Sequence, residues 1–211
     1  MKTRSKKKTI LLVIGIIIGA GILYWLLTCS VLFSFLYLVS KNASVDVNTD
    51  ITKYEDYIGE NALDEYDNKW GMDESIFPEK ITADMEIEDY KMVYYNPWDA
   101  QYLSYLVVEY DEADFEQEKE RLQEYDSTEY LGYYGVTGFQ DEYELLAMYA
   151  DSYQGFVYAL SDKEDTIIYV EIIFCNYYLD LEYEEYIDAK YLPVGFDATV
   201  DNPYREEKLG K

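Results

Sequence analysis

The sequence predicts an α+β protein, with an N-terminal transmembrane helix followed by one domain. We expect that domain to hold a mainly antiparallel sheet of about five strands with two to three flanking helices. Three observations carry this prediction: residues 10–39 lack any charged side chain, five later segments have strand-like patterns, and helix-type patterns lie between them. The short polar connections between strands favour antiparallel neighbours, because parallel strands need long crossovers.

The uncharged run, residues 10–39, is typical of a membrane-spanning helix. A run well beyond ~18 residues can cross hydrocarbon because a helix satisfies its own backbone hydrogen bonds. A cleaved signal peptide has an apolar stretch of only about 7 to 15 residues. A lipid-modified Cys29 is also disfavoured, since Thr28 precedes it and the apolar run continues beyond it. We therefore expect an uncleaved signal-anchor helix whose partner is the lipid bilayer.

Positive charge is concentrated before this run. The basic tail, residues 1–9, contains Lys2, Arg4, Lys6, Lys7 and Lys8, whereas Lys41 and Lys53 are the only cationic residues soon after the run. The positive-inside rule then places the N-terminus in the cytoplasm. We expect a single-pass protein of the cell membrane with an extracytoplasmic C-terminal domain.

Gly15 and Gly19 form a G-x-x-x-G pair within the run. Such small residues let two membrane helices approach closely. Glycine is also common in membrane helices, so this pair leaves the oligomeric state open.

The part outside the run is strongly acidic and rich in tyrosine. Residues 41–211 carry all 43 acidic residues against 12 basic ones, and 24 of the 26 tyrosines. Such a surface repels nucleic acid and anionic lipid, so we expect no nucleic-acid partner. Cations, basic proteins and neutral sugars are compatible with it, as is a role in solubility alone. Abundant aromatic and β-branched residues argue against disorder.

The predicted division of the chain has five parts. These are the basic cytoplasmic tail 1–9, the transmembrane helix 10–39, a stalk 40–52, an acidic tyrosine-rich domain 53–196 and a polar C-terminal tail 197–211. Cys29 and Cys175 lie in the span and in an expected core strand, so no disulfide between them is expected.

The domain is expected to open with an amphipathic helix. Thr52 and Glu55 fit a capping box. Apolar residues then recur every four positions up to Gly71, where the helix can stop; they are Tyr54, Ile58, Ala62, Tyr66 and Trp70.

Two strands should follow as a hairpin. From Ile81 the chain alternates apolar and acidic residues, and a phase shift at Asp89-Tyr90 predicts a β-bulge. Residues 96–99 supply a turn, and residues 101–110 form the second strand.

A charged helix and three more strands complete the sheet. Asp111 is the expected N-cap of a helix that runs to about Tyr125. Strands are then expected at residues 143–150, 155–160 and 166–178, with the last one central because it is apolar on one whole face. A short helix from Asp180 and a frayed tail from Asp197 end the chain.

No recognisable catalytic chemistry appears. The chain has no histidine, which excludes Ser-His-Asp and Cys-His catalysis and histidine zinc sites. Acidic pairs are too numerous to indicate a carboxylate-based enzyme. We therefore expect no enzyme, no cofactor and no metal site.

Three hypotheses for the function follow. The first is an outward-facing domain that binds protein or has a structural role in the envelope. The second is a carbohydrate-binding module whose exposed rings stack on a glycan; its candidate residues are Tyr94, Tyr95, Trp98, Tyr133 and Tyr134. The third is a cation-binding acidic surface. Buried tyrosines would favour the first hypothesis, and a row of exposed rings would favour the second.

Overall fold

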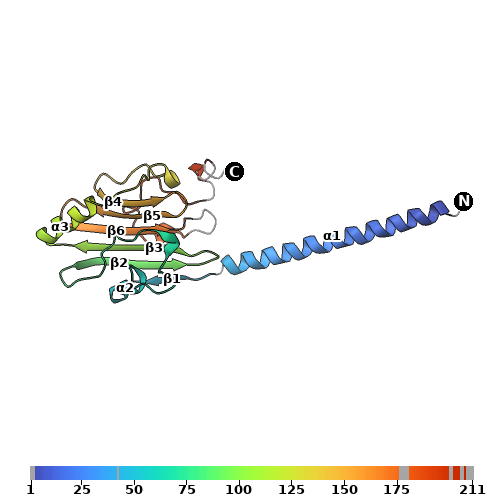
Figure 1. Cartoon of the computed structure of the whole chain (residues 1–211), viewed down its shortest axis with the longest axis horizontal. Coiled ribbons are helices and arrows are strands. Elements are labelled where there is room, and N and C mark those ends of the chain that lie inside the picture. Colours follow the sequence, from blue (N-terminus) through green and yellow to red (C-terminus); the bar gives the residue numbers. More distant parts are fainter. Residues whose placement is uncertain (1–2, 42, 176–180, 200–201, 205–206, 208–211) are drawn as a thin grey trace. The chain divides into compact units, whose positions relative to one another are not determined.

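The computed structural model describes residues 3–41, 43–175, 181–199, 202–204 and 207. The chain divides into two compact units, residues 1–43 and 44–211. The first is a single helix and the second is a sheet domain (Figure 1).

The first unit is helix α1 (Thr3–Lys41). Its 31-residue stretch Lys8–Leu38 is long and apolar enough to cross a bilayer, and the most apolar part is wholly exposed. Gly15 and Gly19 lie about one turn apart on α1, and a Cβ added at either would meet no atom within 4 Å. An N-terminal helix of this kind suits a membrane anchor or a signal sequence.

The second unit is built on a six-stranded antiparallel sheet with the order β1-β2-β3-β6-β5-β4. The bounds of its strands are β1 (Val45–Asn48), β2 (Glu86–Tyr95), β3 (Gln101–Glu109), β4 (Glu144–Asp151), β5 (Gly155–Ser161) and β6 (Thr166–Ile173). With a few helices around this sheet, the α+β class is confirmed.

Several local predictions are confirmed. Strands β2 and β3 form a hairpin, and its register shifts between Ile87 and Asp89, next to the predicted position at Asp89-Tyr90. Strands β4, β5 and β6 form a meander, in which β6 is central because it lies between β3 and β5. Helix α3 (Glu112–Gln123) begins at the expected N-cap, where the Asp111 carboxylate accepts hydrogen bonds from the N–H groups of Ala113 and Asp114.

The long helix expected over residues 52–70 is not formed. The segment contains only the 3₁₀ turn η1 (Ile51–Lys53), the short helix α2 (Tyr54–Tyr57) and the 3₁₀ turn η2 (Lys69–Gly71). Ile58 is already extended, and Gly59 has a φ of +86°, which ends the helix. Asp50, not Thr52, caps the first turn by accepting from the Thr52 N–H. The apolar repeat instead marks side chains that reach the sheet from turns.

The sheet has one strand more than expected, because β1 lies in the segment predicted as a stalk. Residues 45–48 pair with residues 92–95 of β2, so the folded domain begins at about Ser44. A four-residue strand is too short to show a reliable alternation in the sequence.

The C-terminal part differs as well. Asp180, where a short helix was expected to begin, lies outside the described residues, and the segment that follows contains the 3₁₀ turn η4 (Tyr183–Glu185) in place of that helix. Strand β6 ends at Ile173, where Phe174 takes a φ of +66°, and residues 176–178 of the predicted strand lie outside the described residues. In the predicted tail, Ala198 and Asn202 are buried, so the domain extends past residue 196.

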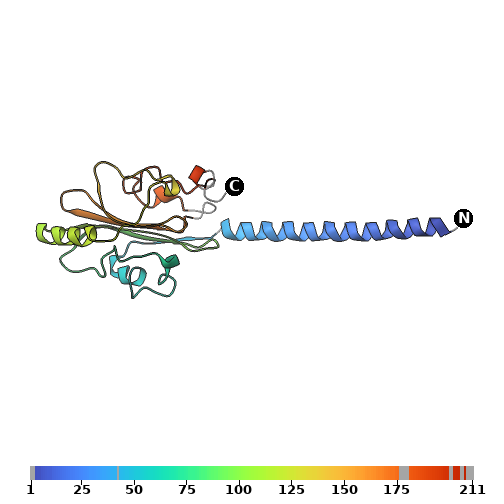
Figure 2. The same ribbon diagram turned by 45° about the horizontal axis from the view of Figure 1, so that its top comes forward.

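Both faces of the sheet are covered, as Figure 2 shows. One face packs against residues 51–85 and helix α3, through a cluster that includes Tyr54, Ile76, Phe115 and Leu122. The other face packs against segments around Tyr134 and residues 181–198. Because β3, β5 and β6 have a covered layer on each side, almost all of their side chains are buried.

Candidate functional site

The five aromatic residues proposed as a binding surface do not form one surface. Tyr94 packs against the face covered by residues 51–85, whereas Tyr95 packs against the opposite face. Trp98 is exposed in the β2–β3 turn, Tyr133 is half-buried and Tyr134 is fully buried. A buried ring cannot stack on a glycan, so Tyr134 is wrong as a member of such a surface.

The tyrosines of the domain are mostly interior residues. Ten of those in the described part of the chain are buried, and Tyr153 is the one domain tyrosine there that is largely exposed. Several contact each other edge to face, as Tyr66 does with Tyr57 and Tyr94 at centroid distances of 4.8 and 5.4 Å. Their rings therefore build the core.

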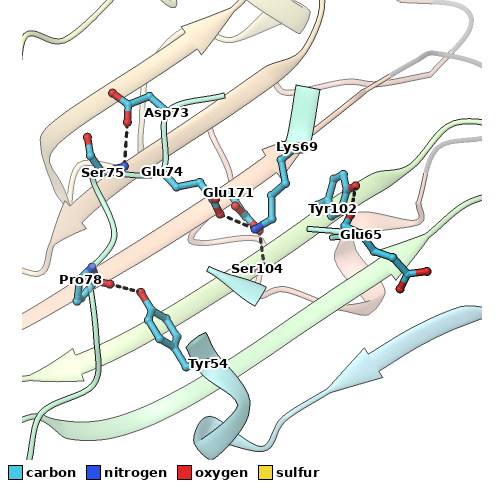
Figure 3. A network of polar contacts seen from close by, with 10 residues as sticks. All are labelled: Tyr54, Glu65, Lys69, Asp73, Glu74, Ser75, Pro78, Tyr102, Ser104 and Glu171. Atoms are coloured by element: carbon cyan, nitrogen blue, oxygen red, sulfur yellow. Dashed lines mark hydrogen bonds and ion pairs between the residues drawn. The ribbon is translucent and has the colours of Figure 1, made fainter. Parts of the chain in front are cut away.

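The most unusual chemistry lies inside the domain. Lys69 is buried with 1% of its side chain exposed, and its Nζ lies 2.7 Å from Oε1 of Glu171 and 2.5 Å from Oε1 of Glu74. The Glu171 side chain is fully buried, and that of Glu74 is 12% exposed. Figure 3 shows these three side chains converging. We call them the Lys69 cluster.

The centre of the sheet positions Glu171. It lies on β6 directly opposite Ser104 on β3 and Val157 on β5. The Ser104 hydroxyl donates a hydrogen bond of 2.6 Å to Oε1 of Glu171. Oε2 of Glu171 is buried and accepts from no N–H or hydroxyl group in the described structure. Glu171 is thus held by two donors on Oε1, Lys69 and Ser104, and only a protonated carboxyl group is left to donate to Oε2.

Residues 51–85, which cover one face of the sheet and are called the covering segment below, position Lys69. Lys69 and Trp70 have φ values of +32° and +63°, an unfavourable backbone conformation for residues with a Cβ. Trp70 holds this turn in place, because its Nε1 donates to the Ala100 carbonyl at 2.7 Å and its ring stacks on Phe174. The Lys69 ammonium also lies 5.7 Å from the centre of the Tyr102 ring. The turn directs Lys69 inward.

Further side chain to backbone hydrogen bonds anchor the segment that carries Lys69 and Glu74. The Tyr102 hydroxyl donates to the Glu65 carbonyl and the Tyr54 hydroxyl to the Pro78 carbonyl, both visible in Figure 3. From helix α3, Arg121 donates to the carbonyls of Ser75 and Ile76. Residues 65–78 are therefore fixed on both sides of the cluster.

One lysine facing two glutamates leaves an excess negative charge in a region with little water. The pKa of the Glu74 carboxyl is raised to about 8: burial is the largest cause, the nearby Glu171 carboxylate adds to it, and Lys69 opposes both effects. The raised pKa favours the protonated form of Glu74 at neutral pH, which reduces the excess negative charge of the cluster. A protonated Glu74 is also the group that can donate to Glu171, as two carboxyl groups do when they share a proton.

The sequence analysis did not single out the Lys69 cluster. One indication was present: Glu171 interrupts a run of apolar residues in the strand expected to be central, and a buried carboxylate needs a partner. Nothing nearby in the sequence shows that this partner is Lys69, which is 102 positions away.

No metal site is seen within the described ranges, where no three His, Cys, Asp or Glu residues are grouped so that they could hold an ion. Comparisons with protein-family models, with curated proteins and with solved structures give no match for this chain.

Proposed function

We propose that this chain is a single-pass membrane protein whose acidic C-terminal domain faces outward and serves as a structural or protein-binding module of the cell envelope. The observation that carries the proposal is the 31-residue apolar stretch of α1, which has no buried residue and is preceded by a basic tail. An exposed apolar helix of this size is costly in water and stable in lipid. The charge bias supports an inward N-terminus.

Two features of the domain support an interaction or structural role over sugar binding. Its tyrosine rings are largely used for the core, and among its described tyrosines only Tyr153 is largely exposed. Its surface carries a large excess of carboxylates, which favours a basic protein partner and steers its approach.

Orientation can be tested with a membrane-impermeant maleimide on intact cells. Glu129→Cys places a thiol on an exposed site of the domain, and Ser5→Cys places one in the basic tail. We expect Glu129→Cys to be labelled in intact cells, and Ser5→Cys to be labelled only after lysis. The unmodified protein measures background from Cys29 and Cys175. Labelling of Ser5→Cys but not Glu129→Cys in intact cells would overturn the proposed orientation.

Membrane anchoring itself needs a separate measurement. The full chain should remain with the membrane fraction after washing with high salt and with carbonate, and detergent should release it. Release by carbonate alone would contradict a spanning helix.

A further inference from the structure

We propose that the Lys69 cluster forms a covalent bond within the chain, an isopeptide amide between Nζ of Lys69 and the side-chain carboxyl of Glu171, with Glu74 as the proton carrier. This inference concerns the sheet domain alone and holds whether or not α1 spans a membrane.

Proximity is the first argument. Nζ of Lys69 lies 2.7 Å from Oε1 of Glu171. Oε1 is bonded directly to the side-chain carbon that the amine would attack. Glu171 is held in the central strand, and Lys69 is held by an anchored turn. Fixing two reacting groups in this way gives effective concentrations of about 10⁵ M or more for well-oriented pairs.

The low polarity of the surroundings is the second argument. A lysine ammonium and a carboxylate are normally unreactive toward each other because the amine is protonated and the carboxylate is a poor electrophile. Burial disfavours both charges. Transfer of one proton from Lys69 to Oε2 of Glu171 yields a neutral amine and a neutral carboxylic acid, which are the reactive forms; Glu74 can relay this proton because it contacts Lys69 and shares a hydrogen bond with Glu171.

The remaining groups match the needs of the reaction. The amine attacks the side-chain carbon of Glu171, and the C–N bond forms while negative charge develops on Oε1. Ser104 already donates a hydrogen bond to this oxygen and stabilises that charge. Glu74 gives its proton to the departing Oε2 hydroxyl and takes one from the Lys69 nitrogen, which it contacts.

The step balances without any added reactant. The C–N bond replaces the bond from the Glu171 carbon to Oε2, one water leaves, and Glu74 ends in the protonated state in which it began. Its raised pKa favours this state at neutral pH. The bond also removes Oε2, which is buried without an N–H or hydroxyl donor, and it removes two buried charges.

The product would join the covering segment to the central strand. Lys69 and Glu171 are 102 positions apart, and a link across so long a loop restricts the unfolded chain strongly. Both cysteines are free, so the domain has no disulfide for this purpose.

Intact-mass spectrometry of the full chain tests the proposal. The protein is purified in detergent, denatured and weighed, with allowance for the N-terminal methionine. We expect a mass lower than that of the sequence by one water. The variant Lys69→Arg, which keeps the charge but cannot form this amide, should have its full mass. The matched variant Lys53→Arg changes an exposed lysine and should keep the deficit of one water.

Peptide mapping then locates the bond. We expect one branched tryptic product containing both Lys69 and Glu171, with no cleavage after Lys69. Glu74→Gln, which cannot carry the proton, should lower the cross-linked fraction at least tenfold in protein that is folded by near-ultraviolet circular dichroism.

Several results would overturn the proposal. One is a full mass in the folded unmodified protein, a result that does not depend on any variant folding. Another is a water deficit that persists in Lys69→Arg, and a third is a branched product that joins Lys69 to Glu74 instead.

Discussion

At the scale of single residues, this domain buries a charged lysine at a position where the core would ordinarily have an apolar residue. Removing either charge from a buried pair leaves the other uncompensated, which usually costs about 3–5 kcal/mol. Lys69 meets this constraint by facing two glutamates, one of which has a raised pKa. Outside the cluster several buried tyrosines use their rings for packing and their hydroxyl groups for hydrogen bonds, as Tyr54 does with the Pro78 carbonyl.

The state of Glu74 makes a prediction for the pH dependence of stability. Its pKa rises from an ordinary value of 4.5 to about 8 on folding, with burial as the largest cause. The folded state therefore binds more protons than the unfolded state between these values. The resulting contribution of Glu74 to the stability of the folded state is fully present below about pH 4.5, and it is lost as the pH rises toward 8.

Glu74→Gln removes this contribution, because glutamine stays neutral at every pH. We expect the free energy of unfolding of the unmodified protein, relative to Glu74→Gln, to fall by a few kcal/mol between pH 5.5 and pH 8.5. Urea denaturation of both proteins at the two pH values measures it. Repulsion among the surface carboxylates affects both proteins alike and cancels in the difference. An equal difference at both pH values would contradict a raised pKa, and because burial is its main cause the expected direction does not require the amide bond.

At the scale of elements, the start of β5 in the meander depends on a residue without a side chain. Strand β5 begins at Gly155, which pairs with Ile173 on β6 and Asp151 on β4. Its φ is +120°, and a Cβ there would lie 2.1 Å from the Ile172 carbonyl oxygen. The two strands can approach this closely only because position 155 has no side chain.

Gly155→Ala should therefore destabilise the domain by about 3 kcal/mol or more, since the clash is with backbone that cannot rotate away. Gly132→Ala is the matched control, because Gly132 also has a positive φ of +83° but a Cβ there would meet no atom within 4 Å. That change should cost only about 1–2 kcal/mol of backbone strain. Denaturation midpoints measure both, and equal costs would show that the close approach at Gly155 does not limit stability.

At the scale of the whole domain, the hairpin and the meander become one sheet through the pairing of β3 with β6. These two strands are the innermost of the six, and both of their faces are covered. Strand β1 is a short strand at one edge with exposed residues. Local opening should therefore be easiest at β1 and hardest at the centre.

Hydrogen exchange of the full chain should reflect this order. We expect the slowest backbone amides in β3 and β6, intermediate ones in β5, and the fastest strand amides in β1, with at least a hundredfold between the extremes. Exchange in β6 as fast as in β1 would contradict the central position of β6.

The sequence by itself determined the features that depend on neighbours along the chain. The uncharged run predicts α1, the Asp111 carboxylate predicts the start of α3, and alternation with short polar connections predicts the hairpin and the meander. Each depends on groups within a few residues of each other, so the pattern shows them directly. The central position of β6 was also predictable, because one of its faces is apolar throughout.

Only the tertiary structure decided which distant segments meet. The repeat at Tyr54, Ile58 and Tyr66 has the spacing of a helix, yet the covering segment bends at Gly59 and buries these residues from turns. The approach of Lys69 to Glu171 has no trace in the sequence near Lys69, because a charged residue in a polar stretch is ordinarily exposed. Lys69 is held in the interior by its ion pair with Glu171 on β6, and its turn is held by the contacts of Trp70 with Ala100 and Phe174. These partners are distant in the sequence, so the contacts exist only once the sheet has formed.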